Sequence, residues 1–393
     1  MGVIGEKIEQ AQRILDEENT ELWLTFVRES ETAGDPVLDL ILGESCTWHS
    51  AFIIPAEGEP VAIVGSLDEA RIKETGAYEV IGYREGIGKV LIEQLDRFSP
   101  AKIAINYSEN DVMADGLSHG MYLTLAKYLE GTRYAEALVS SEGIVSKLRG
   151  RKAPEEIRRI KVNIDLTLDI FFRVSGIIKP GMTEKEVAAF ILGEVEKEGV
   201  ETSWESSQCP AVFTGPESAG AHARPTDRKI EKGHVLNIDF GTRTLEYCSD
   251  LQRTWYFLRD GEEDAPEEVK KPFDVIRDSI AMAAERIRPG MEGREIDSIA
   301  RDYIVENGYE EYPHALGHQV GRSTHDGAGL LCPVWERYGN LPFLKIEENQ
   351  VYTLEPRINI PGYGVATIEE IIVVREDGGE FLSDPQRELI LVK

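Results

Sequence analysis

The chain has no long apolar run. In its 393 residues no stretch approaches the about 18 consecutive apolar residues that a membrane-crossing helix needs, so we expect no segment that spans a bilayer. The first twenty residues are polar and helix-patterned, without a basic start followed by an apolar segment. We therefore also expect no secretory signal.

Basic residues are in a clear minority. The chain has 43 lysines and arginines against 71 aspartates and glutamates, which gives a formal net charge of −28. This balance argues against nucleic acid or an anionic membrane surface as a partner and favours a soluble, self-repelling surface. The apolar fraction of 41% is that of a globular protein, and the length exceeds one ordinary core, so we expect two domains.

Cysteine is scarce and scattered. Cys46, Cys209, Cys248 and Cys332 form no CxxC pair, which favours free, mostly buried thiols in a reduced cytoplasm. Cys248 lies two residues before Asp250, and we interpret it as a packing residue.

The first third of the chain alternates helical and strand-like patterns. An amphipathic helix is expected up to about Asn19, followed by short β-rich runs and a further helix, which predicts an α/β domain. From Ser140 the chain turns basic and loop-like, until a long helical pattern starts near Pro154. We therefore predict two domains, residues 1–148 and 149–393. The expected strands are 22–27, 49–55, 60–65, 79–83 and 102–107, and the second helix is 66–76.

The second predicted domain contains an internal repeat. The triplet PGM occurs at Pro180 and again at Pro289, and the sequences that follow the two triplets resemble each other. After the first triplet, Thr183 and Glu186 form a capping-box signature, so each copy is predicted to be a turn that leads into an amphipathic helix. A carboxylate-bearing hairpin follows each helix, which predicts two related halves that face each other.

Each half carries two acidic residues within or at the ends of β-rich runs. Asp239 ends one run and Asp250 begins the next, and the polar residues between them predict a hairpin turn. Glu355 and Glu369 belong to a second pair of runs, which a PGYG turn separates. Each pair is expected to lie close to directly opposed positions of its hairpin. With His318, the candidate set is Asp239, Asp250, His318, Glu355 and Glu369.

Four carboxylates in this arrangement need a counter-charge. Opposed carboxylates would have Cβ atoms about 5 Å apart, and bare like charges at that distance destabilise a sheet. Four carboxylates with one imidazole match the needs of two divalent ions held about 3.5–4 Å apart around a shared water. The oxygen-rich set favours Mn, Co, Fe or Zn over a metal selected by thiolates.

The constellation resembles the metal-dependent pita-bread peptidases, the family of prolidase, aminopeptidase P and methionine aminopeptidase. The resemblance rests on Asp250 eleven residues after Asp239, on His318 in GHQVG, on Glu355 in LEP and on Glu369 fourteen residues later. The segment before the catalytic domain is similar to the amino-terminal domain of prolidases, aminopeptidases P and creatinases. The resemblance implies an α/β N-terminal domain, an α+β pita-bread catalytic domain with an internal pseudo-twofold repeat, and a homodimer.

The same resemblance implies a metallopeptidase that cleaves Xaa-Pro bonds, in dipeptides or at the N-terminus of short peptides. The nucleophile would be a hydroxide that bridges two divalent ions, Mn or Co before Zn or Fe. The five candidates become the metal ligands, with Glu369 rather than Glu370 as the last. Glu355 would carry a proton from the attacking water to the leaving amine. His222 and His325 match positions that contact the substrate and the developing oxyanion.

Two positions depart from the family pattern and bear on the substrate. Asp326 stands where relatives commonly have glutamate, and Thr367 stands two residues before the last ligand, where relatives often have arginine. The loop LLCPVWERYGNLPFL, which precedes Glu355, is expected to line the substrate pocket with Trp335 and Tyr338 as walls.

Three functions stay open on this fold. The first is Xaa-Pro peptide hydrolysis, and the second is hydrolysis or lyase chemistry on a nonpeptide small molecule such as a cyclic amide. The third is a non-catalytic binding protein, against which the retention of all five ligands argues. Arg322 and Arg357 are candidates to orient a carboxylate, as guanidinium groups often do, with a surface role as the alternative.

Overall fold

The computed structural model describes residues 2–217 and 224–393 of the chain. The chain forms two compact units, Met1–Arg149 and Gly150–Lys393, and this division falls one residue from the domain boundary expected from the sequence. Within the described ranges, no helix is long and apolar enough to cross a membrane.

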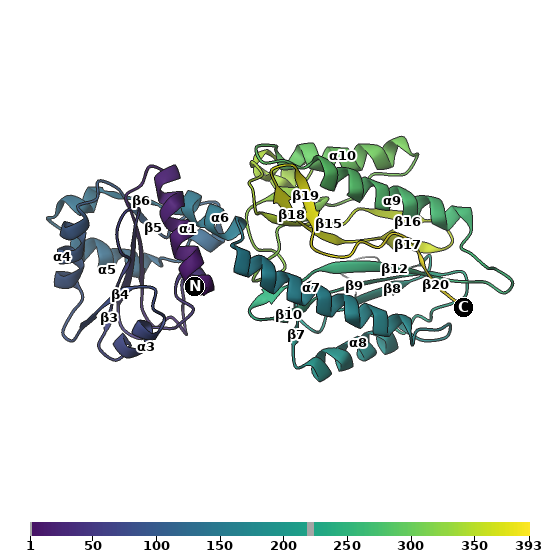
Figure 1. Ribbon diagram of the computed structural model, residues 1–393, viewed down its shortest axis with the longest axis horizontal. Helices are drawn as coiled ribbons and strands as arrows, with labels where there is room; N and C mark the ends of the chain where they lie inside the picture. Colours follow the sequence, from purple (N-terminus) through teal and green to yellow (C-terminus); the bar gives the residue numbers. More distant parts are fainter. Residues whose placement is uncertain (1, 218–223) are drawn as a thin grey trace. The chain divides into compact units, whose positions relative to one another are not determined.

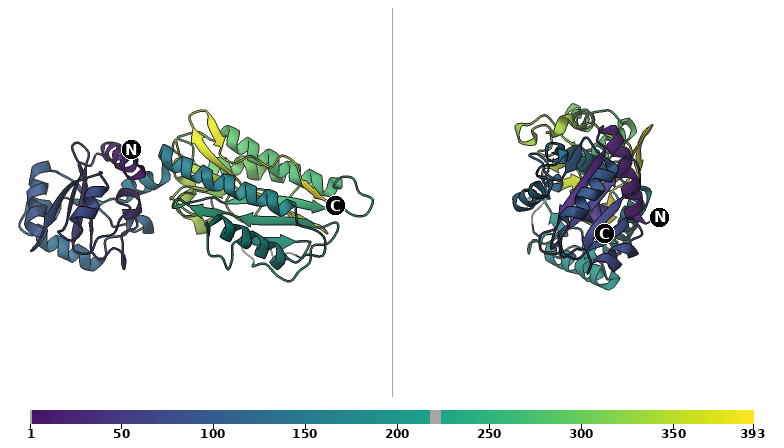
Figure 2. Two further views of the ribbon diagram at one scale, coloured as in Figure 1. Left: turned by 60° about the horizontal axis from the view of Figure 1, so that its bottom comes forward. Right: turned by 90° about the vertical axis from the view of Figure 1, so that its left-hand side faces the viewer.

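The first unit is a six-stranded sheet with helices on both faces (Figures 1 and 2). Its elements are α1 (Val3–Glu17), β1 (Leu22–Val27), α2 (Leu38–Ile41), β2 (Ser50–Pro55), β3 (Val61–Gly65), α3 (Glu69–Glu74), β4 (Glu79–Tyr83), α4 (Gly88–Phe98), β5 (Ile103–Ile105), α5 (His119–Leu129), β6 (Leu138–Ser140) and α6 (Glu142–Gly150). The strand order is β4-β3-β2-β1-β5-β6. Successive strand residues point to opposite faces, so Leu24 packs with α4 and α5 while its neighbour Trp23 packs with α1.

The strands expected from the apolar runs are present as β1 to β5. The prediction of a loop from Ser140 to Pro154 is wrong, because α6 occupies most of that segment. Ile144, Val145 and Leu148 are spaced to share one face of a helix, and all three are buried in the core beside α1. The basic residues of the segment make this helical spacing of apolar residues hard to recognise in the sequence.

The second unit has two halves, each with two helices and a set of strands. The first half contains α7 (Pro154–Ser175), α8 (Glu184–Glu198), β7 (Glu201–Thr202), β8 (Ala211–Thr214), β9 (Val235–Phe240), β10 (Thr242–Thr244), β11 (Tyr247–Cys248) and β12 (Leu251–Phe257). The second half contains α9 (Glu267–Arg286), α10 (Gly293–Glu306), β13 (Gly317–His318), β14 (Leu330–Leu331), β15 (Val351–Leu354), β16 (Arg357–Ile360), β17 (Gly364–Thr367), β18 (Glu370–Arg375), β19 (Gly378–Phe381) and β20 (Ile390–Val392).

The strands of the second unit lie between the two pairs of helices (Figure 1). Val351 of β15 belongs to the core formed with α7 and α8, whereas the next residue, Tyr352, belongs to the core formed with α9 and α10. Alternate residues of one strand therefore pack against helices of different halves.

The two PGM turns have the same construction. Gly181 and Gly290 adopt positive φ angles of 93° and 89°, and each donates its N–H to a backbone carbonyl at 2.8 Å. The carboxylate of Glu186 accepts the N–H of the cap residue of α8, and that of Glu295 does the same for α10, at 2.7 Å in both cases. The internal repeat expected from the sequence is thus present in the backbone.

The registers of the two hairpins place the carboxylates. In the β9–β12 pair Asp239 lies opposite Gln252, so Asp250 is diagonal to Asp239 and not opposed to it. The β15–β18 and β16–β17 pairs share one register, which places Glu355 opposite Glu369 in the interval between them. An isolated β-bridge between Gln252 and Glu369 links the two hairpins, so the carboxylates of both halves meet at this junction.

Candidate metal centre

The five candidate ligands stand at strand ends or in strand breaks. Asp239 is the last residue but one of β9, and Asp250 directly precedes β12. His318 ends β13, Glu355 directly follows β15, and Glu369 directly precedes β18. All five line one cavity of about 790 Å³, so the structure brings the whole predicted set together.

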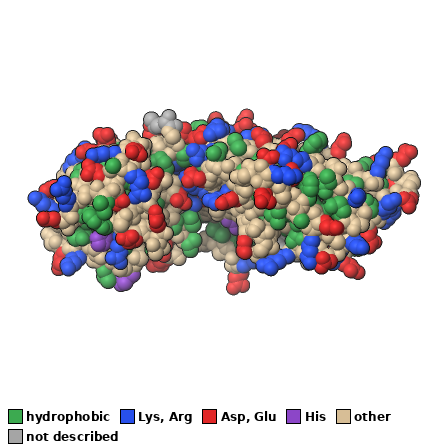
Figure 3. All heavy atoms as spheres, turned by 90° about the horizontal axis from the view of Figure 1, so that it is seen from below, with side chains coloured by type: hydrophobic (Ala, Val, Ile, Leu, Met, Phe, Trp, Pro, Cys, Tyr) green, Lys and Arg blue, Asp and Glu red, His purple; other side chains and the backbone are tan. Residues whose placement is uncertain are grey.

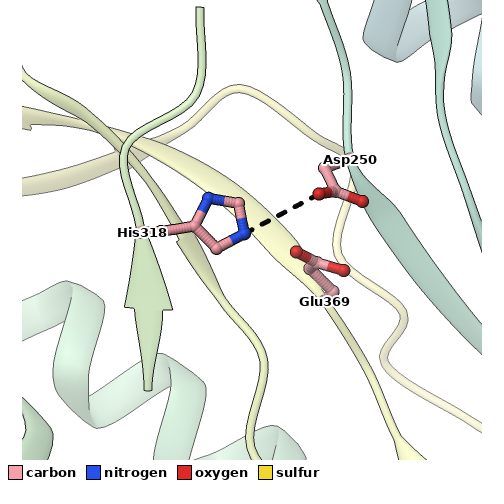
Figure 4. A group of neighbouring side chains, drawn as sticks. All are labelled: Asp250, His318 and Glu369. Carbon is pink, nitrogen blue, oxygen red and sulfur yellow. Dashed lines mark ion pairs between the residues drawn. The ribbon is translucent and has the colours of Figure 1, made fainter. Parts of the chain in front are cut away.

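The imidazole lies among the carboxylates. His318 Nε2 is 3.7 Å from Asp250 Oδ2 and 3.6 Å from Glu355 Oε1. Ligand atoms of Asp250, His318 and Glu369 all lie within 4.8 Å of one another, and Figure 4 shows these side chains converging. The two His318 contacts are too long for hydrogen bonds. They suit atoms that share an ion, because two ligands each about 2.0–2.2 Å from one metal lie roughly 3–4 Å apart.

Burial makes the four carboxylates hard to ionise together. Asp239 and Asp250 are each 7% exposed, and Glu369 is 2% exposed. Loss of solvation raises the pKa of Asp239 to about 7, and it raises the pKa values of Asp250, Glu355 and Glu369 well above their ordinary range. Repulsion among the carboxylates raises the pKa values of the last three further. The cluster therefore holds either protons or cations.

Hydrogen bonding around the cluster is incomplete in a way that fits a metal ion. Oδ1 of Asp239 is buried and has no hydrogen-bond partner among the described residues, which is costly for a carboxylate oxygen. Gln252 donates its Nε2 to Glu369 Oε2 at 2.9 Å and so fixes that carboxylate. An ion is the partner that the oxygen-rich donor set suits, and the residues present therefore fit a divalent metal site.

Glu370, the neighbour of Glu369, is engaged elsewhere. Its carboxylate forms an ion pair with Arg253 at 3.1 Å and accepts hydrogen bonds from the Ser383 hydroxyl and the Gln386 N–H. Adjacent residues at a strand start point to opposite faces, and it is Glu369 that lines the cavity. The geometry supports the choice of Glu369 as the last ligand.

Two glycines let the backbone around His318 approach its neighbours closely. A Cβ at Gly317 would lie 1.8 Å from the carbonyl oxygen of Thr353, and a Cβ at Gly321 would lie 2.1 Å from Asp326 Oδ2. The N–H of His318 donates to Thr353 Oγ1 at 3.1 Å. His318 is therefore held against β15 by contacts that only glycine beside it permits.

The histidines expected to contact substrate fall in different places. His325 lines the cavity, and its ring centroid is 4.2 Å from that of His318. His222 lies outside the described residues. His314 also lines the cavity, with its Nδ1 2.8 Å from the carbonyl oxygen of Ala315. Two imidazoles besides the candidate ligand thus line the cavity.

The two aromatic wall candidates also differ. Tyr338 lines the cavity, whereas Trp335 stacks on Tyr338 from behind, with ring centroids 5.9 Å apart. Trp335 lines a neighbouring hollow. The central guanidinium carbons of Arg301 and Arg337 lie 5.0 and 4.6 Å from the centre of its ring. The expectation of two direct walls is therefore corrected: Trp335 supports the wall that Tyr338 forms.

Some residues of the site were not identified from the sequence. Gln252 lies two residues after Asp250, so period-two alternation gives a signal that it shares a strand face with that ligand. The remaining walls carry no such signal, because only the folded chain brings them together. Trp204, Gln208, Ala211 and Pro313 are among them, whereas Leu330 and Leu341 belong to the loop that the sequence predicted to line the pocket.

Arg357 brings a positive charge to this acidic cavity. It lies opposite Thr367 in the β16–β17 pair, so this chain has an arginine on the strand that faces the position where relatives often have one. Burial lowers the pKa of the Arg357 guanidinium, and its side chain forms no ion pair or hydrogen bond within the described part of the chain. Arg322, the other candidate, pairs with Glu246 at 3.5 Å and lies over the Tyr247 ring.

Comparison with known proteins shows where this architecture occurs. An uncharacterized peptidase of Bacillus subtilis is 28% identical over 347 residues, which are 87% of this chain and 90% of that protein. The solved structure of an Xaa-Pro dipeptidase from Bacillus anthracis is 25% identical, with a TM-score of 0.72, and the match covers 98% of this chain and 99% of that one. An X-Pro aminopeptidase from Thermotoga maritima is also 25% identical, with a TM-score of 0.68 and the same coverage.

These likenesses extend over both units and confirm the predicted fold, an α/β domain followed by an α+β pita-bread domain with an internal repeat. Residues 158–376, more than half of the chain, match the family model of the M24 metallopeptidases. The matched range includes all five candidate ligands. The chain belongs to metallopeptidase family M24.

Proposed function

We propose that this metallopeptidase hydrolyses Xaa-Pro peptide bonds, in dipeptides or at the N-terminus of short peptides. The observation that carries the proposal is the meeting of four carboxylates, three of them buried, with His318 around a cavity of about 790 Å³. Two solved structures that are similar over nearly the whole chain are an Xaa-Pro dipeptidase and an X-Pro aminopeptidase, which supports this substrate class.

The proposed cofactors are two divalent metal ions, Mn or Co, with Zn or Fe as the next candidates. An oxygen-rich donor set with a single imidazole supports these hard or borderline ions. When bound, such ions acidify a shared water and polarise the scissile carbonyl. The proposed ligands are Asp239, Asp250, His318, Glu355 and Glu369.

Glu355 is the proposed proton carrier. A carboxylate beside the attacking water can accept its proton and then deliver it to the leaving amine. The side chain of Glu355 is 21% exposed against 10% for Asp250, so Glu355 is the more open of these two to the cavity. His325, and His222 by the family resemblance, would donate a hydrogen bond to the developing oxyanion, a type of contact worth about 2.7–4 kcal/mol.

The decisive experiment is release of the amine product from Ala-Pro, Ala-Pro-Ala and Ala-Ala. The protein is first treated with a chelator, and Mn²⁺ or Co²⁺ is then added back. Cleavage of Ala-Pro alone, only after metal is restored, would identify a dipeptidase. Preference for Ala-Pro-Ala would identify an aminopeptidase, and cleavage of Ala-Ala at the same rate would remove the requirement for proline.

Absence of cleavage despite metal uptake would contradict the proposed substrate. The departures at Asp326 and Thr367 then direct the search to nonpeptide C–N substrates such as cyclic amides. Absence of both cleavage and metal uptake would support a non-catalytic binding protein on the same fold.

We further propose that the protein acts as a cytoplasmic homodimer on small peptides. All four cysteines are free and buried, which is typical of a reduced compartment. The dimer rests on the resemblance to prolidases, and size-exclusion chromatography with light scattering tests it. A monomer at micromolar concentration would contradict this part of the proposal.

A further inference from the structure

A buried lysine and a buried aspartate meet beside the cavity. Lys152 lies just before α7 and Asp326 lies in the loop after β13, 174 residues apart in the chain. Lys152 Nζ is 3.2 Å from Asp326 Oδ2 and 2.9 Å from the carbonyl oxygen of Asp326. The two side chains are 0% and 1% exposed. Lys152 therefore binds both the side chain and the backbone of Asp326.

Stability alone is a weak reason for such a pair. Removal of two charges from water carries a large desolvation cost, and apolar residues of similar volume often stabilise a core as well or better. Lysine and aspartate are almost never fully buried unless they are paired. The role of this pair is therefore best sought in the chain segments that it holds.

The pair fixes the loop that carries His325. The carboxylate of Asp326 accepts the N–H of Arg322 at 2.9 Å, and the N–H of Asp326 donates to the carbonyl oxygen of Gln319 at 3.0 Å. These bonds close the segment after β13 around the Asp326 carboxylate. His325 directly precedes Asp326, and its ring contacts that of His318.

Both ends of this arrangement are tightly restrained. A Cβ at Gly321 would lie 2.1 Å from Asp326 Oδ2 and 2.7 Å from Lys152 Nζ, so only glycine at this position leaves room for the pair. The backbone N–H of Lys152 donates to the carbonyl oxygen of Asn349 at 2.9 Å, two residues before β15. Lys152 is thus anchored to the strand that leads to Glu355.

We propose that Lys152 is a positioning residue that acts through Asp326 to hold His325 at the cavity. Lys152 is not among the described residues that line the cavity, so it acts on the reaction only through the loop. The inference rests on the role proposed above for His325 in contacting the substrate. It gives a function to the segment at the start of the second unit.

The first test compares Lys152→Met with the double variant Lys152→Met/Asp326→Asn. Lys152→Met keeps the length of the side chain but removes the ammonium group that binds the Asp326 carboxylate. We expect kcat for Ala-Pro to fall by about 10- to 100-fold, the size of effect that small misplacements of catalytic groups produce, with KM and bound metal nearly unchanged. The double variant removes both charges, so it should recover thermal stability but not kcat. Recovery of both would show that the pair serves stability only and would overturn the inference.

A double-mutant cycle on activity distinguishes a specific effect through His325 from a general loss of structure. His325→Ala removes the side chain that Lys152 is proposed to hold. Adding Lys152→Met to His325→Ala should therefore cost little further activity, because the two residues act as one unit. Additive losses would show that Lys152 acts on some other part of the enzyme and would reject its role through His325.

Amide hydrogen exchange tests the restraint without any substrate. In Lys152→Met we expect faster exchange at the N–H groups of Arg322 and Asp326, with protection in β9 and β12 unchanged. If the wild-type enzyme cleaves none of the peptides, the proposed substrate fails, while this measurement still decides whether Lys152 restrains the loop. Exchange at the wild-type rate at both amides would contradict the claim that Lys152 restrains the loop.

Two control variants match the changes in charge and in stability. Lys345→Met removes the same charge from an exposed pair with Glu292, whose atoms are 3.0 Å apart, and should leave kcat and exchange at wild-type values. Ile191→Ala truncates a buried residue of α8 and should lower the melting temperature without lowering kcat of the folded enzyme. A loss of kcat in Ile191→Ala equal to that in Lys152→Met would attribute the effect to stability and overturn the positioning role.

Discussion

In the proposed mechanism Glu355 has two tasks, metal binding and proton transfer, that many enzymes divide between residues. It stands 3.6 Å from His318 among the candidate ligands, and it is also the carboxylate proposed to carry the proton. Glutamine has nearly the same volume and keeps one oxygen as a donor to a metal, but it cannot carry a proton.

We expect Glu355→Gln to lower kcat for Ala-Pro by about 10²- to 10⁴-fold, the usual contribution of a positioned acid–base group. The fold should persist, because no cavity is created. Steady-state kinetics and circular dichroism, with metal content measured alongside, check this outcome. Undiminished turnover would remove Glu355 as the proton carrier.

Arg357 is the residue that should sense the carboxyl end of the substrate. Its guanidinium lies in the cavity without an ion-pair partner among the described residues, and the carboxylate of a dipeptide is only three bonds from the carbon that is attacked. We expect Arg357→Met to raise KM for Ala-Pro by roughly 10- to 150-fold, which corresponds to the loss of about 1.5–3 kcal/mol from a hydrogen bond to a charged group.

The amide Ala-Pro-NH₂ lacks that carboxylate, so its KM should change little in Arg357→Met. Arg375→Met removes an arginine that instead pairs with Glu380 at 2.8 Å on an exposed edge, and it should affect neither substrate. Equal loss with Ala-Pro and Ala-Pro-NH₂ would contradict a role for Arg357 in carboxylate recognition.

The sequence predicts which acidic residues form the site better than it predicts which residues surround them. The positions of Asp239 and Glu369 follow from β-rich runs and fixed spacing, which are local properties. The place of Trp335 does not, because it depends on Arg301, which reaches its ring from α10. Contacts between distant segments leave no periodic trace in the chain.

Among the elements, β13 shows how a two-residue strand can hold a site residue. Gly317 lets it approach β15 so closely that any side chain would collide with the carbonyl oxygen of Thr353 at 1.8 Å. We expect Gly317→Ala to lower stability by about 1–3 kcal/mol and to weaken metal binding, because the backbone of His318 must move. Thermal unfolding and Mn²⁺ titration measure the two effects.

Gly193→Ala is the matched control. Gly193 lies inside α8 with no atom within 4 Å of the added Cβ, so alanine should stabilise the protein by about 0.5–1 kcal/mol through its helix propensity. Wild-type metal affinity in both glycine variants would show that close approach at Gly317 is not needed for the site.

Element types and order could largely be predicted from the sequence, and so could the opposition of Glu355 and Glu369, whereas the register of Asp239 and Asp250 could not. Apolar alternation identified β1 to β5, and the PGM turns identified the starts of α8 and α10. Asp239 and Asp250 are diagonal because the register of β9–β12 continues through β10–β11 to a turn at Leu245 and Glu246, whose φ angles are 51° and 66°. A turn centred one residue earlier would have opposed the two aspartates directly, and the polar stretch between the strands does not fix where the turn is centred.

For the whole molecule, removal of metal should make stability depend on pH in a definite direction. The raised pKa values mean that the folded state binds protons more tightly than the unfolded chain does. Stability of the metal-free protein therefore falls as pH rises from the ordinary carboxyl range, about 4, through the raised values, which for Asp239 is about 7. Bound metal displaces these protons, so its stabilising effect should grow with pH.

Melting temperatures of chelated and Mn²⁺-loaded protein between about pH 5 and pH 8 check this expectation. At an ion concentration of 100 times Kd the gain should be about 2.7 kcal/mol, and the gap between the two curves should widen as pH rises. Asp239→Asn lacks one of the shifted groups and should flatten the curve of the chelated protein. A gap independent of pH would show that the cluster is not protonated in the metal-free state.

The net charge of −28 will affect any titration of the protein with metal ions. Acidic side chains are spread over the face of the molecule in Figure 3, interspersed with lysine and arginine. Exposed carboxylates bind divalent ions weakly, and salt screens them far more than it screens a buried cluster. Metal titrations at about 0.15 M salt should therefore detect ions bound at the buried cluster and not ions bound weakly by surface carboxylates.

The repeat in the second unit has a consequence for how the site is kept intact. The first half supplies Asp239 and Asp250, and the second supplies His318, Glu355 and Glu369, so neither half holds a complete set. A bound ion thus acts as a cross-link between two copies of one structural unit, and its binding energy depends on how well they dock. Substitutions far from the cavity that loosen this docking should reduce metal affinity, and the ion should in turn resist separation of the halves.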